Sequence, residues 1–433
     1  MNSNKEKFYD LIVIGGGTSG AAAAISAARN GIKTLLIEKN SYLGGAMTSQ
    51  LVMPMMNNIS FRNEDYKSSI LAEILSELYV SGDGVVYKDG NPGWFNPEKM
   101  KFVLETCALR AGVSILYDNV VVDVIKEGEI IRGIKNFYKG ITSEYMAKYF
   151  VDATGDANLA AMSGVKFENG EDGKNQFMSL RFEMGGVDIK QLANWMIEHK
   201  IDDEVSNVFC KNEEDIYLSI GFSYGKNKSP YSAINKLVDK ALEDKVIDED
   251  DINYIQFFSI PGKSGMLSFN APRINSPLNP LSSEDTTKAL IKGRAAIVRL
   301  EKFFRNYIPG FEKSFVSSVA NELGIRDSRR ICSEYILRKN DIEKGKIFDK
   351  NIFESDYPSD IHQKDKTISQ ERKQFGAPYE CCLNREVKNL FVIGRCIGAD
   401  FYAQGALRIQ PNCFAMGEHI VNYIKNLLRN ATL

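Results

Sequence analysis

The 433-residue chain has few of the residues that build metal sites, and its cysteines show no pairing pattern. Its 3 histidines, His199, His362 and His419, form no ligand motif, so we expect no metal site. Its 7 cysteines are scattered, odd in number and without C-x-x-C spacing. This usage is typical of reduced thiols, and we expect a cytoplasmic protein.

The sequence also lacks an excess of charge and a long apolar run. Lys and Arg number 54 against 56 Asp and Glu, which leaves a formal net charge of -2. This balance gives no electrostatic reason to expect nucleic acid or an anionic membrane as a partner. No apolar stretch is long enough to span a bilayer, and residues 1–7 carry no apolar signal-peptide segment. We expect neither partner, and the oligomeric state stays open.

A glycine motif near the N-terminus is the strongest positive signal. Gly15, Gly17 and Gly20 form G-x-G-x-x-G between an apolar run at 9–14 and a helix-forming segment at 21–29. The first glycine permits a tight turn, the second lets the backbone approach a pyrophosphate, and the third lets the helix pack on the strand. The helix N-terminus then offers free N–H groups to phosphate. The alternative is a glycine-rich turn that binds no ligand.

The residues that follow the motif favour dinucleotide binding over a bare turn. A second apolar strand at 32–37 ends at Glu38, which closes a βαβ unit. A carboxylate at this position accepts hydrogen bonds from ribose hydroxyls. We therefore interpret the unit as the binding site of a dinucleotide.

Three later features favour FAD over NAD. Gly44-Gly45 forms a second glycine turn, Thr154-Gly155-Asp156 follows a strand, and Gly394-Arg395 ends an apolar strand before a helix that begins near Pro411. A helix N-terminus aimed at the flavin ring would stabilise the negative charge of reduced flavin. No second G-x-G-x-x-G of this kind occurs, so we expect no separate NAD(P)H domain. The predicted cofactor contacts are Gly15, Gly17, Thr18, Ser19, Gly20, Glu38, Lys39, Gly44, Gly45, Ala46, Thr48, Val121, Thr154, Gly155, Asp156, Gly394, Arg395, Gln410 and Asn412.

The order of apolar patterns predicts an α/β chain with a discontinuous cofactor domain. Strand-like segments dominate up to about residue 150, and the same patterning returns at 389–393. The region between them mixes strand-like stretches with acidic segments that are typical of helices, among them 202–215. We expect a Rossmann-like, glutathione-reductase-like FAD-binding domain from residues 1–163 and 376–433, with an inserted α+β substrate domain at 164–375.

Several stretches together resemble the FAD-dependent oxidoreductase family of bacteria and archaea, which is related to fumarate-reductase-type flavoproteins. They span nearly the whole chain in order: Leu43-Gly44-Gly45-Ala46-Met47-Thr48, Pro309-Gly310-Phe311-Glu312 leading to 324–331, Ser359-Asp360-Ile361-His362, and 389–395 with 406–411. The resemblance implies bound FAD and redox chemistry without naming a substrate. The family often has Glu where this chain has Asp327, so we assign Asp327 no catalytic role.

The fumarate-reductase comparison also allows a covalent link between FAD and a histidine near the first glycine turns. No histidine precedes His199 in this chain. We therefore expect FAD to be bound non-covalently.

His362 is the best acid–base candidate, because the ordinary pKa of histidine suits proton transfer near neutrality. The alternative is a surface or structurally bonded histidine. Arg326, Arg329 and Arg330 form the densest basic cluster, and Arg326 and Arg330 would share a face if this stretch were helical. The cluster would clamp a substrate carboxylate or polarised oxygen, or form buried ion pairs between domains, and both interpretations stay open. Arg408, just before the C-terminal helix, is expected near the flavin edge.

The sequence thus predicts an FAD-dependent dehydrogenase or reductase that acts on a small organic substrate by hydride transfer through flavin N5. His362 would carry the proton, and Arg408, Arg326 and Arg329 would position an electron-rich group such as a carboxylate. The electron donor or acceptor is not indicated by any motif. Two alternatives are a flavin monooxygenase and a non-catalytic flavoprotein or redox sensor.

Overall fold

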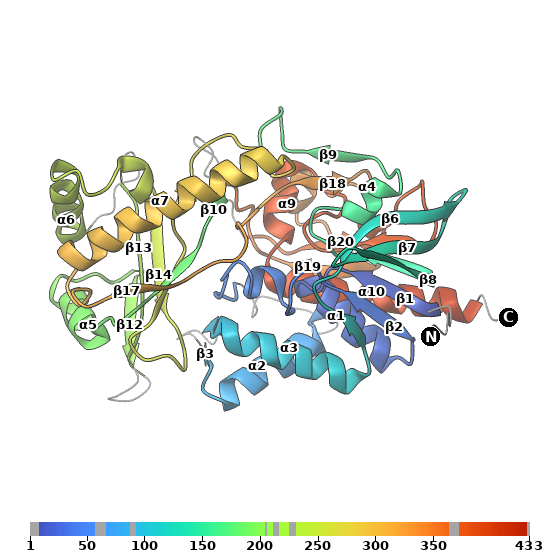
Figure 1. The fold of residues 1–433 in the computed structure, drawn as a ribbon, viewed down its shortest axis with the longest axis horizontal. Coiled ribbons are helices and arrows are strands. Elements are labelled where there is room, and N and C mark those ends of the chain that lie inside the picture. Colours follow the sequence, from blue (N-terminus) through green and yellow to red (C-terminus); the bar gives the residue numbers. More distant parts are fainter. Residues whose placement is uncertain are drawn as a thin grey trace.

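The computed structural model describes residues 8–56, 66–86, 92–203, 206–210, 216–224, 231–362 and 372–430. It contains two large sheets (Figure 1). A mixed sheet lies with α1 and α10 at the end of the molecule that holds both termini, and an antiparallel sheet lies with α5, α6 and α7 at the other end. No helix in these ranges is long and apolar enough to cross a bilayer.

The mixed sheet takes strands from both ends of the chain. Its order is β5-β2-β1-β8-β7-β6, and β21 pairs with the end of β8. The strands β5, β2, β1, β8 and β21 run parallel, whereas β6 and β7 continue the sheet as an antiparallel extension. The bounds are β1 Phe8–Ile14, β2 Thr34–Ile37, β5 Ser114–Leu116, β6 Val120–Glu127, β7 Ile130–Tyr138, β8 Ile141–Asp152 and β21 Leu390–Val392.

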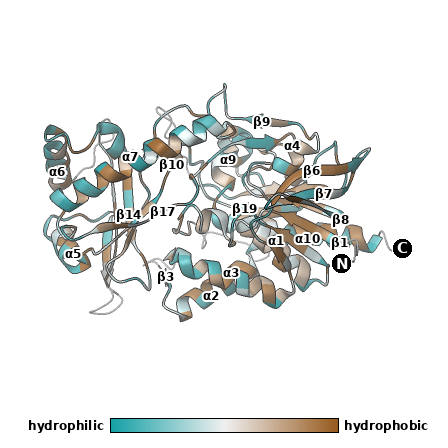
Figure 2. Ribbon diagram, in the orientation of Figure 1, coloured by the Kyte–Doolittle hydropathy of each residue, from teal (hydrophilic) through white to brown (hydrophobic). Residues whose placement is uncertain are grey.

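Both faces of this sheet are covered, which explains the continuous apolar runs of its parallel strands. Leu11 and Val13 of β1 point into the core beneath the helices, while Ile12 and Ile14 point into a separate core on the opposite face. Figure 2 shows hydrophobic residues concentrated on these strands. The covering helices are α1 Thr18–Arg29, α2 Ser69–Val80, α3 Pro97–Ala111 and α10 Gln410–Asn430.

Glycines allow α1 to lie unusually close to its neighbours. A Cβ atom on Gly20 would lie 1.8 Å from the carbonyl oxygen of Gly15, in the turn that follows β1. A Cβ atom on Gly417 of α10 would lie 2.1 Å from the carbonyl oxygen of Ser19. The N-terminal turn of α1 is therefore packed closely between the turn that follows β1 and helix α10.

The antiparallel sheet has the order β12-β13-β14-β15-β11-β17. Its core is rich in phenylalanine: the rings of Phe182 and Phe269 stack at 4.5 Å, and Phe304 of α7 meets Phe257 edge-on at 5.6 Å. The bounds are β11 Phe182–Gly185, β12 Asn207–Cys210, β13 Ile216–Phe222, β14 Ile255–Ser259, β15 Leu267–Phe269, β17 Phe315–Val319, α5 Ile189–Glu198, α6 Ser232–Glu243 and α7 Ser283–Tyr307.

Short elements connect the two parts. They are β3 Gly84–Val86, β4 Pro92–Phe95, α4 Asn158–Met162, β9 Phe167–Asn169, β10 Met178–Ser179, β16 Arg273–Ile274, β18 Arg329–Ile331, α8 Lys339–Glu343, β19 Asn351–Ser355, β20 Phe375–Pro378 and α9 Phe401–Leu407, with short 3₁₀ turns at Gly45–Met47, Glu249–Ile252 and Tyr379–Cys382.

One sequence-based expectation of helix is wrong, and the condition for a shared helical face of the arginines is not met. The segment 202–215 contains the strand β12, which pairs with β13. This pairing satisfies the backbone N–H and C=O groups of β12. Residues 204–205 and 211–215 lie outside the described residues. The arginine stretch also contains a strand, β18, which pairs with β9. Arg326 and Arg330 therefore do not share a helical face.

The core of the antiparallel part draws on a shorter stretch of the chain than the predicted insertion at 164–375. Its buried residues come from 178–323 and Leu51. Leu337, Phe353 and Phe375, which also belong to the predicted insertion, pack instead into the core beneath α1 and α10. The division into domains stays a prediction, and these contacts bear on where its second boundary lies.

The glycine contact between α10 and α1 makes a stability prediction. We expect Gly417→Ala to lower the free energy of unfolding by about 3 kcal/mol, because the new methyl would overlap the Ser19 carbonyl in a packed core. Urea unfolding followed by circular dichroism measures the change. Asn422→Ala, at an exposed position of the same helix, should stay within about 0.5 kcal/mol of the parent. Equal stability of the two variants would contradict the close contact.

Candidate functional site

The three motif glycines occupy three different environments. Gly15 has φ +97°, and a Cβ atom there would lie 2.5 Å from the carbonyl oxygen of Ala153. Gly20 is equally tight against Gly15. Gly17 differs, because the heavy atom nearest to a Cβ added there would be Cα of Gly45, at 3.9 Å. The backbone of Gly17 thus faces open space, as a close approach to a pyrophosphate requires.

A second glycine turn lies beside the first. Gly44 donates its N–H to the carbonyl oxygen of Gly16 at 2.9 Å, and Gly44 and Gly45 have φ values of +112° and +51°. Ala46 lies half-buried in the turn after Gly45. Buried Thr48 closes this turn by donating its hydroxyl to Leu43. Together the two turns form a cradle of backbone atoms.

The start of α1 points into this cradle. Thr18 and Ser19 are buried in its first turn. The N-cap is Gly17, which makes no side-chain capping bond, and the first turn has no acidic residue. The free N–H groups of the helix end are therefore available to an anionic ligand.

Glu38 is held rigidly at the end of β2. Its Oε2 accepts the N–H of Gly16 at 2.5 Å, and its Oε1 accepts the N–H of Asn40 at 2.8 Å. Burial raises the pKa of Glu38, although both backbone bonds oppose the shift. Each oxygen keeps a further lone pair for a ribose hydroxyl. Lys39 instead forms an ion pair with Glu322 at 2.6 Å and is largely exposed.

Arg395 joins the returning strand to the end of β8. Its guanidinium donates to the carbonyl oxygens of Gly155 and Ile325, both at 2.6 Å, and to the carboxylate of Asp156 at 2.5 Å. Thr154 donates its hydroxyl to Asp152 at 2.7 Å. These contacts favour a role for Arg395 in bonding flanking backbone over contact with a cofactor phosphate.

Two other predicted contacts lie on the same sheet. Gly394, with φ +87°, is close to the first turn of α1, where an added Cβ would lie 2.9 Å from Oγ of Ser19. Val121 lies half-buried on β6 and packs against the core on the opposite face of the sheet from α1.

Unpaired polar atoms gather where α10 begins. Oε1 of Gln410, Oδ1 of Asn412 and Nε of Arg408 are buried without a hydrogen-bond partner. The amide groups of Gln410 and Asn412 are otherwise held by Val52 and Ala406. Buried polar groups are nearly always satisfied, so these atoms are candidates to contact a bound ligand that has both donors and acceptors. A flavin ring offers both.

The segment 176–181 brings the other candidate residues together. Phe177 donates its N–H to the carbonyl oxygen of His362 at 2.9 Å. Ser179 exchanges two backbone hydrogen bonds with Gly324, at 2.7 and 3.2 Å. Ser179 also belongs to β10, which pairs with β16. Three segments distant in sequence therefore meet along one short strand.

His362 forms a close pair with Asp360. Nε2 of His362 lies 2.9 Å from Oδ1 of Asp360, and Arg408 donates to the Asp360 carbonyl oxygen at 2.9 Å. Burial and Arg326 lower the pKa of His362 to about 3, which outweighs the opposing effect of Asp360. Against burial, His362 and Arg408 lower the pKa of Asp360 below its usual range. These shifts run against the expected titration of His362 near neutrality and favour a neutral imidazole beside an ionised carboxylate.

The predicted arginine cluster is dispersed. Arg326 donates to the carbonyl oxygen of Phe177 at 2.7 Å and lies on the His362 side. Arg329 donates to the Asp156 carbonyl oxygen at 3.0 Å, beside the end of β8, and buried Arg330 bonds backbone carbonyl oxygens. Only Arg326 joins His362 and Arg408.

Sequence reasoning missed four residues of this site. The guanidinium of Arg273 stacks at 3.9 Å on the ring of Tyr254. Arg181 is 5% exposed. Burial and the nearby charge of Asp360 both raise the pKa of Tyr357. The four residues come from separate segments within short or irregular elements. No local motif could have identified them.

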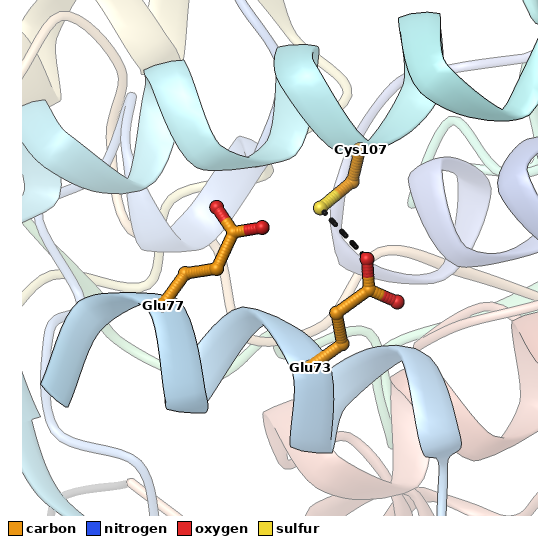
Figure 3. Close-up of side chains that lie close together, drawn as sticks. All are labelled: Glu73, Glu77 and Cys107. Carbon is orange, nitrogen blue, oxygen red and sulfur yellow. Dashed lines mark hydrogen bonds between the residues drawn. The ribbon is translucent and has the colours of Figure 1, made fainter. Parts of the chain in front are cut away.

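A second group of ionisable residues lies between α2 and α3 (Figure 3). Glu73, Glu77 and Cys107 place possible metal ligands within 4.8 Å of one another. However, Arg29 pairs with Glu73 and Arg110 pairs with Glu77, each at 2.7 Å. Burial and Glu73 raise the pKa of Cys107 to about 11, so the thiol keeps its proton, whereas metals bind the thiolate. We interpret this group as ion pairs that join three helices.

Comparison with known proteins identifies the family. The model of the family described as FAD dependent oxidoreductase matches residues 10–420. Among curated relatives, a thiamine thiazole synthase of Methanococcus aeolicus is 32% identical over 172 residues, 37% of this chain and 60% of that protein. A digeranylgeranylglycerophospholipid reductase of Thermoplasma volcanium is 30% identical over 169 residues, 36% of this chain and 42% of that protein. The chain therefore matches less than two thirds of either relative.

Two solved structures share the fold. A p-nitrophenol 4-monooxygenase from Pseudomonas putida has a TM-score of 0.53 at 10% identity, covering 98% of this chain and 82% of that chain. A flavin-dependent brominase variant has a TM-score of 0.50 at 14% identity, covering 97% of this chain and 81% of that chain. The predicted Rossmann-like α/β core and the FAD cofactor are confirmed. The chain belongs to the FAD dependent oxidoreductase family, whose members are enzymes that use FAD.

Proposed function

We propose that this protein oxidises or reduces a small organic molecule by hydride transfer, in a site where the segment 360–362 bridges Phe177 and Arg408, just before α10. The observation that carries the proposal is the pairing of His362, Asp360 and Arg408 beside buried polar atoms that lack partners. FAD, when bound, supplies two-electron chemistry at its N5 atom. The protein supplies orientation, charge and a place for the proton.

The residues present fit FAD in three places. The open backbone at Gly17 and the start of α1 would hold the pyrophosphate. Glu38 would accept the ribose hydroxyls. Gln410 and Asn412 would satisfy their unpaired oxygens on the flavin ring. The absence of a histidine before His199 supports a non-covalent cofactor.

His362 would accept the proton, and the lowered pKa of its imidazole supports a group that is neutral at rest. Asp360 would orient the ring and stabilise the cation that forms when the proton arrives. Arg408 holds Asp360 in position through its carbonyl oxygen. Arg326, which destabilises the protonated imidazole, would keep the group a base at rest. Arg329 lies on the β8 side and would serve the cofactor region rather than the substrate.

We infer a glutathione-reductase-like cofactor unit, related to fumarate-reductase-type flavoproteins, with the antiparallel part as an inserted substrate domain. The pairing of β21 with β8 supports a unit made from both ends of the chain. The core drawn from 178–323 supports an insertion smaller than 164–375. We also propose a cytoplasmic enzyme that exchanges electrons with a separate donor or acceptor.

Anaerobic spectroscopy tests the function. Purified holoenzyme would be mixed with a panel of small acids, alcohols and amines, and bleaching of the flavin absorbance would be followed. For a reductase, photoreduced enzyme would be mixed with unsaturated acids and reoxidation followed. If the protein transfers hydride, at least one compound should reduce or reoxidise the flavin in the absence of oxygen, and the flavin absorbance should change accordingly. Oxygen-dependent hydroxylation driven by NADPH would instead favour a monooxygenase. A flavin inert to every compound, with partners that bind one redox state, would favour a sensor.

The motif glycines predict a separation of binding from folding. Gly17→Val should fold and lose FAD, because the heavy atom nearest to an added Cβ lies 3.9 Å away and the φ of -68° suits any residue. Gly20→Ala should destabilise the fold itself, because its methyl meets the Gly15 carbonyl. Flavin content after gel filtration and thermal unfolding distinguish the two. Full FAD retention by Gly17→Val would contradict the pyrophosphate assignment.

The low pKa of His362 predicts its behaviour in solution. We expect its imidazole to stay neutral from pH 8 down to pH 5, since its pKa is lowered to about 3. Histidine NMR signals, assigned by the one lost in His362→Gln, would report the titration. A midpoint near 6.5 for His362 would show that its environment leaves it unshifted.

A further inference from the structure

We propose that the substrate is a small organic dianion of the dicarboxylate class, bound by Arg181, Arg273, Arg326 and Arg408. These residues are called the four-arginine cluster below. The inference rests on the proposed function and names the substrate class of the same site. It is carried by the balance of buried charge and by the hydrogen-bond donors that the protein leaves unused.

The cluster comes from both parts of the molecule. Arg273 lies on β16 and Arg181 follows its partner strand β10, so one pair belongs to the antiparallel part. Arg326 follows Gly324, which bonds Ser179 of β10, and Arg408 precedes α10. Arg326 is close enough to Arg181, Arg273 and Arg408 for each of them to lower its pKa, so the four cations share one region.

The charges around the cluster do not balance. Asp360 is the carboxylate that approaches the cluster, at 3.6 Å from Arg408. Among the described residues, no carboxylate lies within 4.0 Å of Arg181, Arg273 or Arg326. Asp327, which is buried nearby and bonds Asn175 and Gln176, adds at most one negative charge. Among the residues that the structure describes, four cations therefore face two carboxylates.

This surplus is costly in the protein interior. Burial and repulsion from Arg273 and Arg408 lower the pKa of Arg326 to about 9, and burial lowers that of Arg181 to about 9. An anion between the cations would remove this penalty. Two negative charges match the surplus that remains after Asp360 and Asp327.

The guanidinium groups have spare donors. Each offers five N–H groups. Arg181 and Arg326 bond the carbonyl oxygens of Leu51 and Phe177 through one nitrogen each. Nε of Arg273 and of Arg408 is buried without a partner. Paired donors of this kind bind carboxylates in a bidentate manner.

Tyr254 fixes one side of the region. Its ring stacks at 3.9 Å on the guanidinium of Arg273, and its hydroxyl donates to Gln256 at 3.0 Å. A stacked guanidinium keeps its plane, so its donors stay directed at a planar carboxylate. Meanwhile 38% of the Asp360 side chain is accessible, which keeps the region open to a small molecule.

Calorimetry on the oxidised holoenzyme tests the inference independently of turnover. Malonate, succinate and glutarate would be titrated against propionate, succinamide and inorganic phosphate at low ionic strength. We expect at least one dicarboxylate to bind about tenfold more tightly than propionate, and succinamide not to bind. Arg273→Met should weaken that binding about tenfold or more, with Arg273→Lys in between because it keeps the charge and loses the fork. Arg294→Met, at an exposed position of α7, should bind as the parent does.

Other results would overturn the inference. They are equal binding of propionate and the dicarboxylates, tighter binding of phosphate, or unchanged binding by Arg273→Met in a variant that retains FAD and its melting temperature. A cluster that serves only reduced flavin would bind no dicarboxylate, and Arg273→Met would shift the flavin potential alone. If an uncharged compound reduced the flavin, the proposal of a dianionic substrate would be refuted, and the proposed hydride transfer would still stand. Dicarboxylate binding without any flavin turnover by the panel would refute the proposed function instead.

Discussion

The close contact at the first turn of α1 is the constraint on which the cofactor site depends. Gly20 lets α1 lie against the turn after β1, and Gly417 lets α10 lie against the first turn of α1 at Ser19. Both contacts require the absence of a side chain, and both place a helix end where its N–H groups stay free. The open backbone of Gly17 lies between these two contacts. Packing therefore creates the anion site, and a larger residue at either contact would move the helix that forms it.

A second constraint joins the cofactor unit to the antiparallel part. The guanidinium of Arg395 donates hydrogen bonds both to Gly155, just after β8, and to Ile325 in the loop before β18. Gln404 extends the connection, because its amide donates to the carbonyl oxygens of Arg326 and Arg395. The segment that carries Arg326 is thus fixed to the returning strand before any ligand binds. Preorganisation of this kind lowers the ordering cost when a substrate binds.

The sequence predicted the cofactor unit well because its signals are local. The run 9–14, the glycine turn, the helix and Glu38 all lie within about 30 residues and specify one another. The site beyond it depends on pairings distant in the chain: β10 and β16 are two-residue strands, and a loop at Gly324 completes them. No periodicity exists in so short an element. The arginines at 326, 329 and 330 looked like one cluster because they are adjacent in sequence, whereas the irregular backbone before β18 sends them to different partners.

Burial and the arginines together keep the histidine neutral, and the same arginines carry the affinity that we propose for dianions. Burial lowers the pKa of His362 most, and Arg326 and Arg273 add to this effect against the opposing charge of Asp360. An anion bound among those arginines would cancel their repulsion and raise the proton affinity of the imidazole. The histidine would then become a better base when the substrate arrives and return to its resting state when the product leaves. Substrate charge would in this way prepare the group that accepts the substrate's proton.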